Sequence, residues 1–201
     1  DVSGAIDRIE LGVAHRVSMT PREREMTAYH EAGHLLIMYL CHPTHDVYKA
    51  SILERGDTLG SVAGVLREEL HSFDVNSLKA SIQVSLAGYV AEKIVYNVST
   101  TGVSSDFTNA MRTAHQMVWN LGMGSNGFVG DFPQIPESQL SDDLKQKLNT
   151  ETQSLLHTAI KEVEETLKAE RQILDRFALE LVKREELDYD EIVAIFQEYG
   201  K

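Results

Sequence analysis

The sequence is poor in several residue types, and each shortage excludes a class of protein. Its 201 residues contain a single cysteine, Cys41, so an internal disulfide and zinc modules built from several cysteines are both excluded. Lys and Arg number 19 against 31 Asp and Glu, which gives a formal charge of −12. Contacts to nucleic-acid phosphates need clustered basic side chains. We therefore expect no nucleic-acid partner.

Long apolar runs are also missing. The longest candidate, residues 32–41, is interrupted by Gly33 and His34 and is well short of the roughly 20 apolar residues that a membrane-spanning helix needs. The first residue is Asp1 rather than Met, and we expect the sequence to be a piece of a longer chain. Apolar residues nevertheless make up 42% of it, enough for the core of one folded domain.

The spacing of the apolar residues predicts a mainly α-helical fold with a small β-sheet. Two short stretches, residues 47–53 and 60–66, predict strands joined by a turn at Gly56-Asp57. The second is rich in small residues and predicts an edge strand. Helices are predicted over 21–41, 75–96 and 106–120, from 138 onwards, and from Asp188 to a stop at Gly200.

Helix boundaries and domain organisation follow from the same pattern. Thr20, with Glu23 three residues on, predicts a capping box, Asp74 predicts a second cap, and Ser104 or Ser105 a third. The first residues predict a short helix and a linker. We expect three parts: a linker over 1–20, a core over 21–137 and a C-terminal helical annex of the same domain over 138–201.

The pattern with chemical meaning is His30-Glu31-Ala32-Gly33-His34, in the middle of the predicted helix 21–41. Its two histidines lie one turn apart on one helix face, where both imidazoles can bind one tetrahedral Zn²⁺. Glu31 lies about 100° around the helix from His30, so it can reach a water molecule at the metal but is poorly placed to bind the metal. The pattern predicts a zinc-dependent peptidase with Glu31 as general base.

The alternative is a chance match on a helix surface. Against it, a polar trio in the middle of an apolar helix leaves buried polar groups unsatisfied unless something binds them. Gly33 costs about 1 kcal/mol of helix propensity, which is explained if another segment approaches closely there. We favour the metal site.

A catalytic zinc usually has three protein ligands, and spacing alone leaves the third open. Glu92 stands out because small residues surround it on its predicted helix, so a second helix could approach there. Asp106 stands out because it follows a turn at a helix start, although an ordinary N-cap is the alternative for it. The candidates are Asp46, Asp57, His71, Asp74, Glu92, Asp106, His115 and Asp131.

Four stretches, in order and spacing, resemble the FtsH family of membrane-bound, ATP-dependent AAA zinc metalloproteases. Residues 27–34 look like the family's zinc-binding segment, and residues 87–92 resemble its Gly-Gly-Arg-x-Ala-Glu helix. Residues 100–106 are similar to its Thr-Gly-Ala-x-Asn-Asp turn, and residues 6–12 to the segment that leaves its ATPase domain. The chain departs from the family at Ala87, Tyr89 and Ser105 and lacks its Leu-Pro after the edge strand.

The resemblance implies roles for individual residues. Asp106 matches the family's third zinc ligand beside His30 and His34, and Glu92 then supports the ligands without binding zinc. The edge strand near residues 60–66 would hold an extended substrate by strand addition. The implied fold is a helical zinc-peptidase domain with its active-site helix, an edge substrate strand and a C-terminal helical bundle.

The resemblance also implies a setting. The activity would be zinc-dependent endopeptidase cleavage of unfolded or membrane polypeptides in protein quality control, with Zn²⁺ as cofactor. An ATPase domain outside these residues would use ATP and Mg²⁺ to deliver substrates, residues 1–20 being the linker from it. The parent chain would be a membrane-anchored homohexamer, with this domain on the cytoplasmic side of a bacterial inner membrane. A mitochondrial inner membrane or a thylakoid is the alternative.

Three other functions remain open from the sequence. The chain could be a peptidase that works without an ATPase, although residues 6–12 argue against this. It could be an inactive hexamer-building module, against which the complete set His30, Glu31, His34 and Asp106 argues. It could also be a structural zinc protein, in which case Glu31 would be dispensable.

Overall fold

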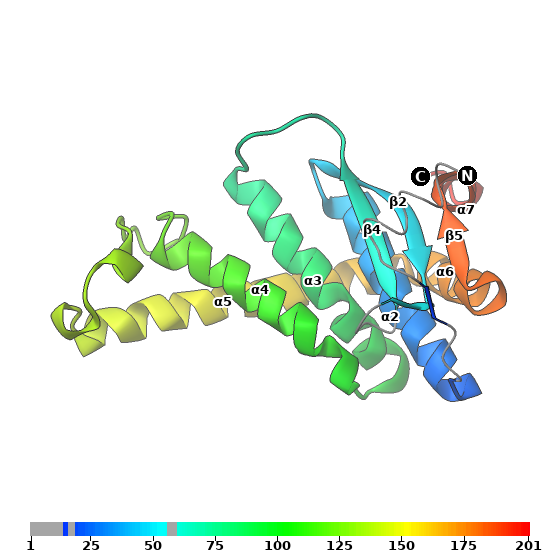
Figure 1. Cartoon of the computed structure of the whole chain (residues 1–201), viewed down its shortest axis with the longest axis horizontal. Coiled ribbons are helices and arrows are strands. Elements are labelled where there is room, and N and C mark those ends of the chain that lie inside the picture. Colours follow the sequence, from blue (N-terminus) through cyan, green and yellow to red (C-terminus); the bar gives the residue numbers. More distant parts are fainter. Residues whose placement is uncertain (1–13, 16–18, 56–59) are drawn as a thin grey trace.

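The computed structural model describes residues 14–15, 19–55 and 60–201. In this part of the chain the fold is mainly helical (Figure 1), with helices α2 (Pro21–Cys41), α3 (Val75–Tyr96), α4 (Ser104–Trp119), α5 (Asp142–Ala169), α6 (Arg171–Arg184) and α7 (Tyr189–Glu198). The strands are β1 (Ala14–His15), β2 (His45–Ser51), β3 (Glu54–Arg55), β4 (Ser61–Leu66) and β5 (Glu186–Asp188).

The start of α2 is determined by local chemistry. The Thr20 side chain accepts a hydrogen bond from the Glu23 backbone N–H, and the Glu23 carboxylate accepts one from the Thr20 N–H, which completes the predicted capping box. Pro21 occupies the first turn, where its missing N–H costs nothing. Asp74 caps α3 in the predicted way, accepting from the Ser77 N–H at 2.8 Å. Both helices have the predicted bounds.

Three strands form an antiparallel sheet in the order β4-β2-β5. Strand β4 pairs with β2 from Ser51↔Ser61 to His45↔Leu66, with a shift in register between Val47 and Lys49. The other edge of β4 pairs with no strand among the residues that the structure describes. Strand β5 was not predicted, because three residues before a helix carry no recognisable alternation.

The core lies where the two halves of the chain meet. Helix α3 packs along α2 on one side and α6 packs against it on another, while the sheet covers α2 as well. Helix α5 crosses α3 and α4. One buried cluster combines Leu35 and Ile37 of α2 with Val90 of α3, Leu174 of α6 and Phe196 of α7. The C-terminal helices therefore complete the hydrophobic core that positions α2.

Some predictions differ from the structure or lie outside it. The residue before α4 is Val103, with no side-chain cap, so neither Ser104 nor Ser105 caps that helix. The helical pattern predicted after residue 138 forms two helices, α5 and α6, because α5 ends at its C-cap, Glu170. The Gly56-Asp57 turn lies outside the described residues, and so do residues 1–13 and 16–18 of the predicted helix and linker over 1–20. Within the described ranges, no helix is long and apolar enough to cross a membrane.

Candidate metal centre

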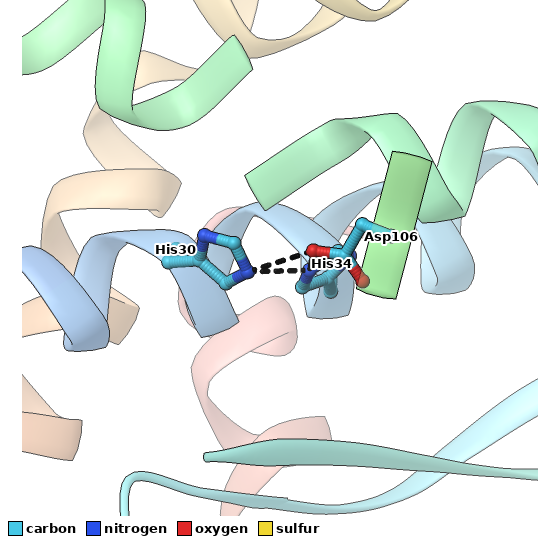
Figure 2. Close-up of side chains that lie close together, drawn as sticks. All are labelled: His30, His34 and Asp106. Carbon is cyan, nitrogen blue, oxygen red and sulfur yellow. Dashed lines mark hydrogen bonds and ion pairs between the residues drawn. The ribbon is translucent and has the colours of Figure 1, made fainter. Parts of the chain in front are cut away.

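Two helices bring three potential metal ligands together (Figure 2). His30 and His34 project from α2, and Asp106 reaches them from the first turn of α4. His30 Nε2 lies 3.0 Å from His34 Nε2 and 3.1 Å from Asp106 Oδ2, and His34 Nε2 lies 3.4 Å from the same carboxylate oxygen. Both histidines are buried and Asp106 is half-buried. Three ligand atoms thus point into one small volume.

The second nitrogen of each imidazole has a partner that orients the ring. His34 Nδ1 lies 2.6 Å from the carbonyl oxygen of Val84, which can only accept, so Nδ1 carries the hydrogen and Nε2 has its lone pair free. His30 Nδ1 likewise donates to the Glu92 carboxylate at 2.8 Å. Both rings therefore direct Nε2 towards Asp106, as metal-binding histidines do.

Glu92 links two of the potential metal ligands but is not one of the three convergent groups. The residue is buried, 1% exposed. Besides the bond from His30, it accepts hydrogen bonds from the Thr100 N–H at 2.6 Å and the Thr100 hydroxyl at 3.0 Å. Thr100 begins the turn that leads to Asp106. One buried carboxylate thus holds a histidine of α2 and the segment that delivers the aspartate.

The electrostatics of the three potential ligands are strongly coupled. Burial opposes a charge on His30, but the hydrogen bonds with Asp106 and Glu92 outweigh it and raise the pKa of His30 to about 10. Burial also works against ionisation of Asp106, yet its interactions with His30 and His34 hold its pKa well below its usual range. The site therefore favours a positive charge held beside an ionised aspartate.

Small residues let the helices approach closely enough for these contacts. A methyl group at Gly33 would lie 2.7 Å from the carbonyl oxygen of Ala87 and 2.9 Å from Ala91 Cβ. A methyl at Gly88 would lie 2.6 Å from His30 Nδ1. Larger side chains at Gly33 or Gly88 would separate α2 from α3 and displace the His30 ring.

Glu31 lies next to the histidines and is also buried, 6% exposed. Burial is the main influence on its carboxylate and raises the pKa of Glu31, although His30 and His34 act in the opposite direction. Glu31 does not belong to the group of three potential metal ligands, His30, His34 and Asp106. Its surroundings suit a proton acceptor rather than a metal ligand.

The remaining candidates for a third ligand have other surroundings. Asp46 accepts from the Val47 N–H, Asp131 accepts from the Asn120 side chain, and His115 stacks on Trp119. Asp74 caps α3 and His71 is exposed, while Asp57 lies outside the described residues. In the parts of the chain that the structure describes, His30, His34 and Asp106 form the one group with metal-ligand spacing.

Two supporting contacts were not predicted from the sequence. The Val84 carbonyl that orients His34 is a backbone atom, so no residue type marks it. Thr100 belongs to a turn that the sequence does identify, but its bond to Glu92 depends on how the turn folds back onto α3. Only the position of Thr100 eight residues after Glu92, just beyond the helix end, hinted at this contact.

The chain is similar to proteins of one known family. The model of Peptidase family M41 matches residues 17–195. The ATP-dependent zinc metalloprotease FtsH of Streptococcus pneumoniae serotype 4 is 30% identical over 208 residues, covering 98% of this chain and 32% of the relative. FtsH of Rubrobacter xylanophilus is 29% identical over 100% of this chain and 33% of its own, and FtsH of Thermus thermophilus 30% identical over 98% and 33%.

The chain therefore spans about a third of the length of the curated relatives it matches. The match runs through α2, α3 and α4, which hold His30, His34, Glu92 and Asp106. The chain belongs to Peptidase family M41 and is homologous over nearly its whole length to FtsH proteases.

Proposed function

We propose that the chain is a zinc-dependent endopeptidase domain in which His30, His34 and Asp106 bind Zn²⁺. The observation that carries the proposal is the spacing of the three ligand atoms, 3.0–3.4 Å from one another. Two ligands that are each ~2.0–2.1 Å from a tetrahedral zinc lie roughly 3.3 Å apart. The three side chains need little rearrangement to share one ion.

The chemistry of the ligand set fits the same ion. Two imidazoles and one carboxylate are ligands that Zn²⁺ accepts, and three protein ligands leave a fourth position open. When bound, zinc polarises a peptide carbonyl and lowers the pKa of water to about 7. Glu92 and the Val84 carbonyl hold the imidazoles in the tautomers that such binding needs.

Glu31 is proposed as the general base. It accepts a proton from the attacking water and passes that proton to the leaving amine, so the carboxylate is regenerated in each cycle. Burial raises its pKa above the ordinary value of a glutamate, which makes the carboxylate a better proton acceptor. Glu92 is engaged by His30 and Thr100 on both of its oxygens, so it does not compete for this role.

The substrate is proposed to be an unfolded polypeptide bound along β4. This strand lies at the edge of the sheet and next to α2, so an extended peptide can add to it through main-chain hydrogen bonds. Such binding reads side chains weakly. We propose that the full-length parent is a membrane-anchored homohexamer whose ATPase domain delivers the substrate. The relatives are named ATP-dependent proteases, which supports the use of ATP.

The test compares the protein with Glu31→Gln, using Glu165→Gln, an exposed glutamate on α5, as the matched control. Unfolded casein serves as substrate because it needs no unfoldase. We expect Glu31→Gln to keep its zinc, measured by mass spectrometry, and to lose at least about 10²-fold in kcat. Equal activity of both variants would show that Glu31 is not the base.

A second pair of variants tests the ligand set. Asp106→Asn removes the charge of a direct ligand, so we expect most of the zinc to be lost. Glu92→Gln leaves the three ligands in place and should keep zinc at micromolar metal. Loss of zinc from Glu92→Gln alone would reverse the assignment. Zinc bound without any cleavage by the unaltered protein would favour an inactive family member.

A further inference from the structure

Strand β4 runs along α2 with glycines at the contacts. Gly60, directly before β4, lies against the Glu31 side chain, and Gly64 within β4 lies against Met38. Residues 60 and 64 face the same side of the strand and are about 13 Å apart. Glu31 and Met38 lie on one face of the helix, about 10 Å apart. The strand therefore follows the helix, and its start lies over the proposed base.

No space exists at Gly60 for a side chain. A methyl group there would lie 2.8 Å from Glu31 Cδ and 2.9 Å from Glu31 Cγ, closer than real Cβ atoms come to other atoms. Glu31 is 6% exposed, so it has little room to swing aside. Gly60 does not have a positive φ, so the backbone conformation does not require glycine. Close approach to the carboxylate is the reason for glycine at this position.

We infer that Gly60 is a positioning residue for Glu31. The backbone at the start of β4 forms the wall that fixes where the carboxylate stands, while the metal ligands on α2 and α4 are held independently through Glu92 and Val84. This inference rests on the proposed function of Glu31 as base. It also links two parts of that function, because the strand that would bind substrate is the element that positions the base.

The test is Gly60→Ala. We expect kcat for casein to fall by about 10²-fold, because misplacing a catalytic group by about 1 Å has that effect, while KM changes less than about threefold. Zinc affinity, measured by competition with a chelating dye, should stay within about twofold. A crystal structure should show Glu31 Cδ displaced. Unchanged kcat, or a Glu31 carboxylate that has not moved, would overturn the inference.

Two further glycines serve as matched comparisons. Gly130 lies in the loop after α4, and a methyl there would meet Phe132 at 3.4 Å, an ordinary contact, so Gly130→Ala should have the activity of the unaltered protein. At Gly64 a methyl would meet the Met38 sulfur at 2.7 Å, the end region of a flexible side chain. Gly64→Ala should affect KM more than kcat. A kcat loss as large as that of Gly60→Ala would contradict a specific role of Gly60.

A shortened base gives the sharpest test. Glu31→Asp withdraws the carboxylate by one methylene and makes room beside residue 60. We expect the double variant, Glu31→Asp with Gly60→Ala, to have a kcat no lower than that of Glu31→Asp alone. The effects of the two substitutions on kcat are then strongly non-additive. Independent losses that multiply would overturn the inference. The double variant also answers the question if Gly60→Ala fails to fold, because the steric conflict is then absent.

The two proposals fail in different ways. If the unaltered protein does not cleave casein with zinc bound, the proposed function fails. The metal-free crystal structures of the protein and of Gly60→Ala still decide whether Gly60 sets the position of the Glu31 carboxylate.

Discussion

Glu92 and Glu151 are two buried carboxylates on long helices, and each accepts hydrogen bonds from a loop. Glu92 is 1% exposed on α3, and Glu151 is 3% exposed on α5. Glu151 accepts from the N–H and hydroxyl of Ser125, the latter at 2.9 Å, and from the Asn126 N–H at 2.7 Å. In burial and in the number of donors the two groups are alike.

They differ in what the donors do. Glu92 uses both oxygens, and one of its donors is the imidazole of His30. Glu151 receives all three of its hydrogen bonds on Oε1, and its buried Oε2 has no hydrogen-bond partner among the residues that the structure describes. Its loop lies at the end of the molecule far from the sheet (Figure 1). A buried, hydrogen-bonded carboxylate therefore does not by itself indicate a functional site; the identity of its donors does.

The largest effect that separates the two is expected on zinc affinity. Glu92→Gln places an NH₂ group against either the His30 Nδ1–H or the Thr100 N–H, so one donor loses its acceptor. Zinc affinity should fall by about 10- to 100-fold. Glu151→Gln should leave it unchanged. Competition titration with a chelating dye measures both, and equal losses would remove the distinction.

The next effect is on the stability of the fold, and here Glu151 should be the more important of the two carboxylates. In Glu151→Gln the new NH₂ group either faces the Ser125 and Asn126 donors or is buried at the position of Oε2. The side chain has no space to adjust, because a methyl group at Gly124 would lie 2.6 Å from Glu151 Cδ. We expect a loss of about 1–3 kcal/mol in the free energy of unfolding. Urea denaturation of the metal-free protein measures it. No loss of stability would mean that the loop does not need this anchor.

His42 extends the comparison to a buried polar group that is neutral. Its Nδ1 accepts from the His45 N–H at 3.2 Å, and its Nε2–H donates to the Ser81 hydroxyl at 3.2 Å. Burial, with smaller contributions from His45 and Arg67, lowers the pKa of His42 to about 4. Below about pH 6.5 this histidine takes up a proton in the unfolded chain but stays neutral in the folded protein. Its contribution to the free energy of unfolding is therefore fully present above pH 6.5 and is lost as the pH falls from 6.5 to 4.

We expect the free energy of unfolding to fall by about 1–2 kcal/mol between pH 7 and pH 5 through this group. Urea denaturation at both pH values measures the change. His42→Gln should show a weaker dependence on pH, and His157→Gln, which replaces an exposed histidine of α5, should retain that of the unaltered protein. An identical dependence in all three proteins would assign the effect to other groups.

The smallest effect concerns the second donor to Glu92. Thr100→Val keeps the backbone N–H but removes the hydroxyl that donates at 3.0 Å. A hydrogen bond to a charged group contributes about 1.5–3 kcal/mol, but Glu92 keeps its bonds from His30 and from the Thr100 N–H. Zinc affinity should therefore fall by at most about tenfold and by less than in Glu92→Gln. Thr108→Val, on the exposed side of α4, is the control. A larger effect for Thr100→Val would indicate that the turn, and not His30, is what Glu92 mainly holds.

The sequence predicts what is encoded locally and misses what depends on distant partners. The bounds of α2 and α3 follow from Thr20, Glu23 and Asp74, which act within one helical turn. The charged face of 141–170 has the pattern of a solvated helix, yet Glu151 is buried, because a loop about 25 residues earlier in the chain covers it. Strand β5 likewise exists only because β2 lies beside it.

The candidate site divides in the same way. His30, Glu31 and His34 are identified by a spacing within one helix. Asp106 could only be selected from several candidates, because its approach to α2 depends on the turn that Thr100 and Glu92 hold together. The contact of Gly60 with Glu31 joins a strand to a helix and has no local pattern at all.

The open edge of β4 has a consequence for solution behaviour. The edge that is proposed to bind an extended polypeptide can also pair with the same edge of another copy, and the exposed Val65 and Leu66 at its end favour such pairing. Arg67, Glu68 and Glu69 follow directly, and charges of this kind next to an apolar strand oppose aggregation. Replacing Glu68 and Glu69 with uncharged residues should therefore lower the concentration at which the protein begins to precipitate.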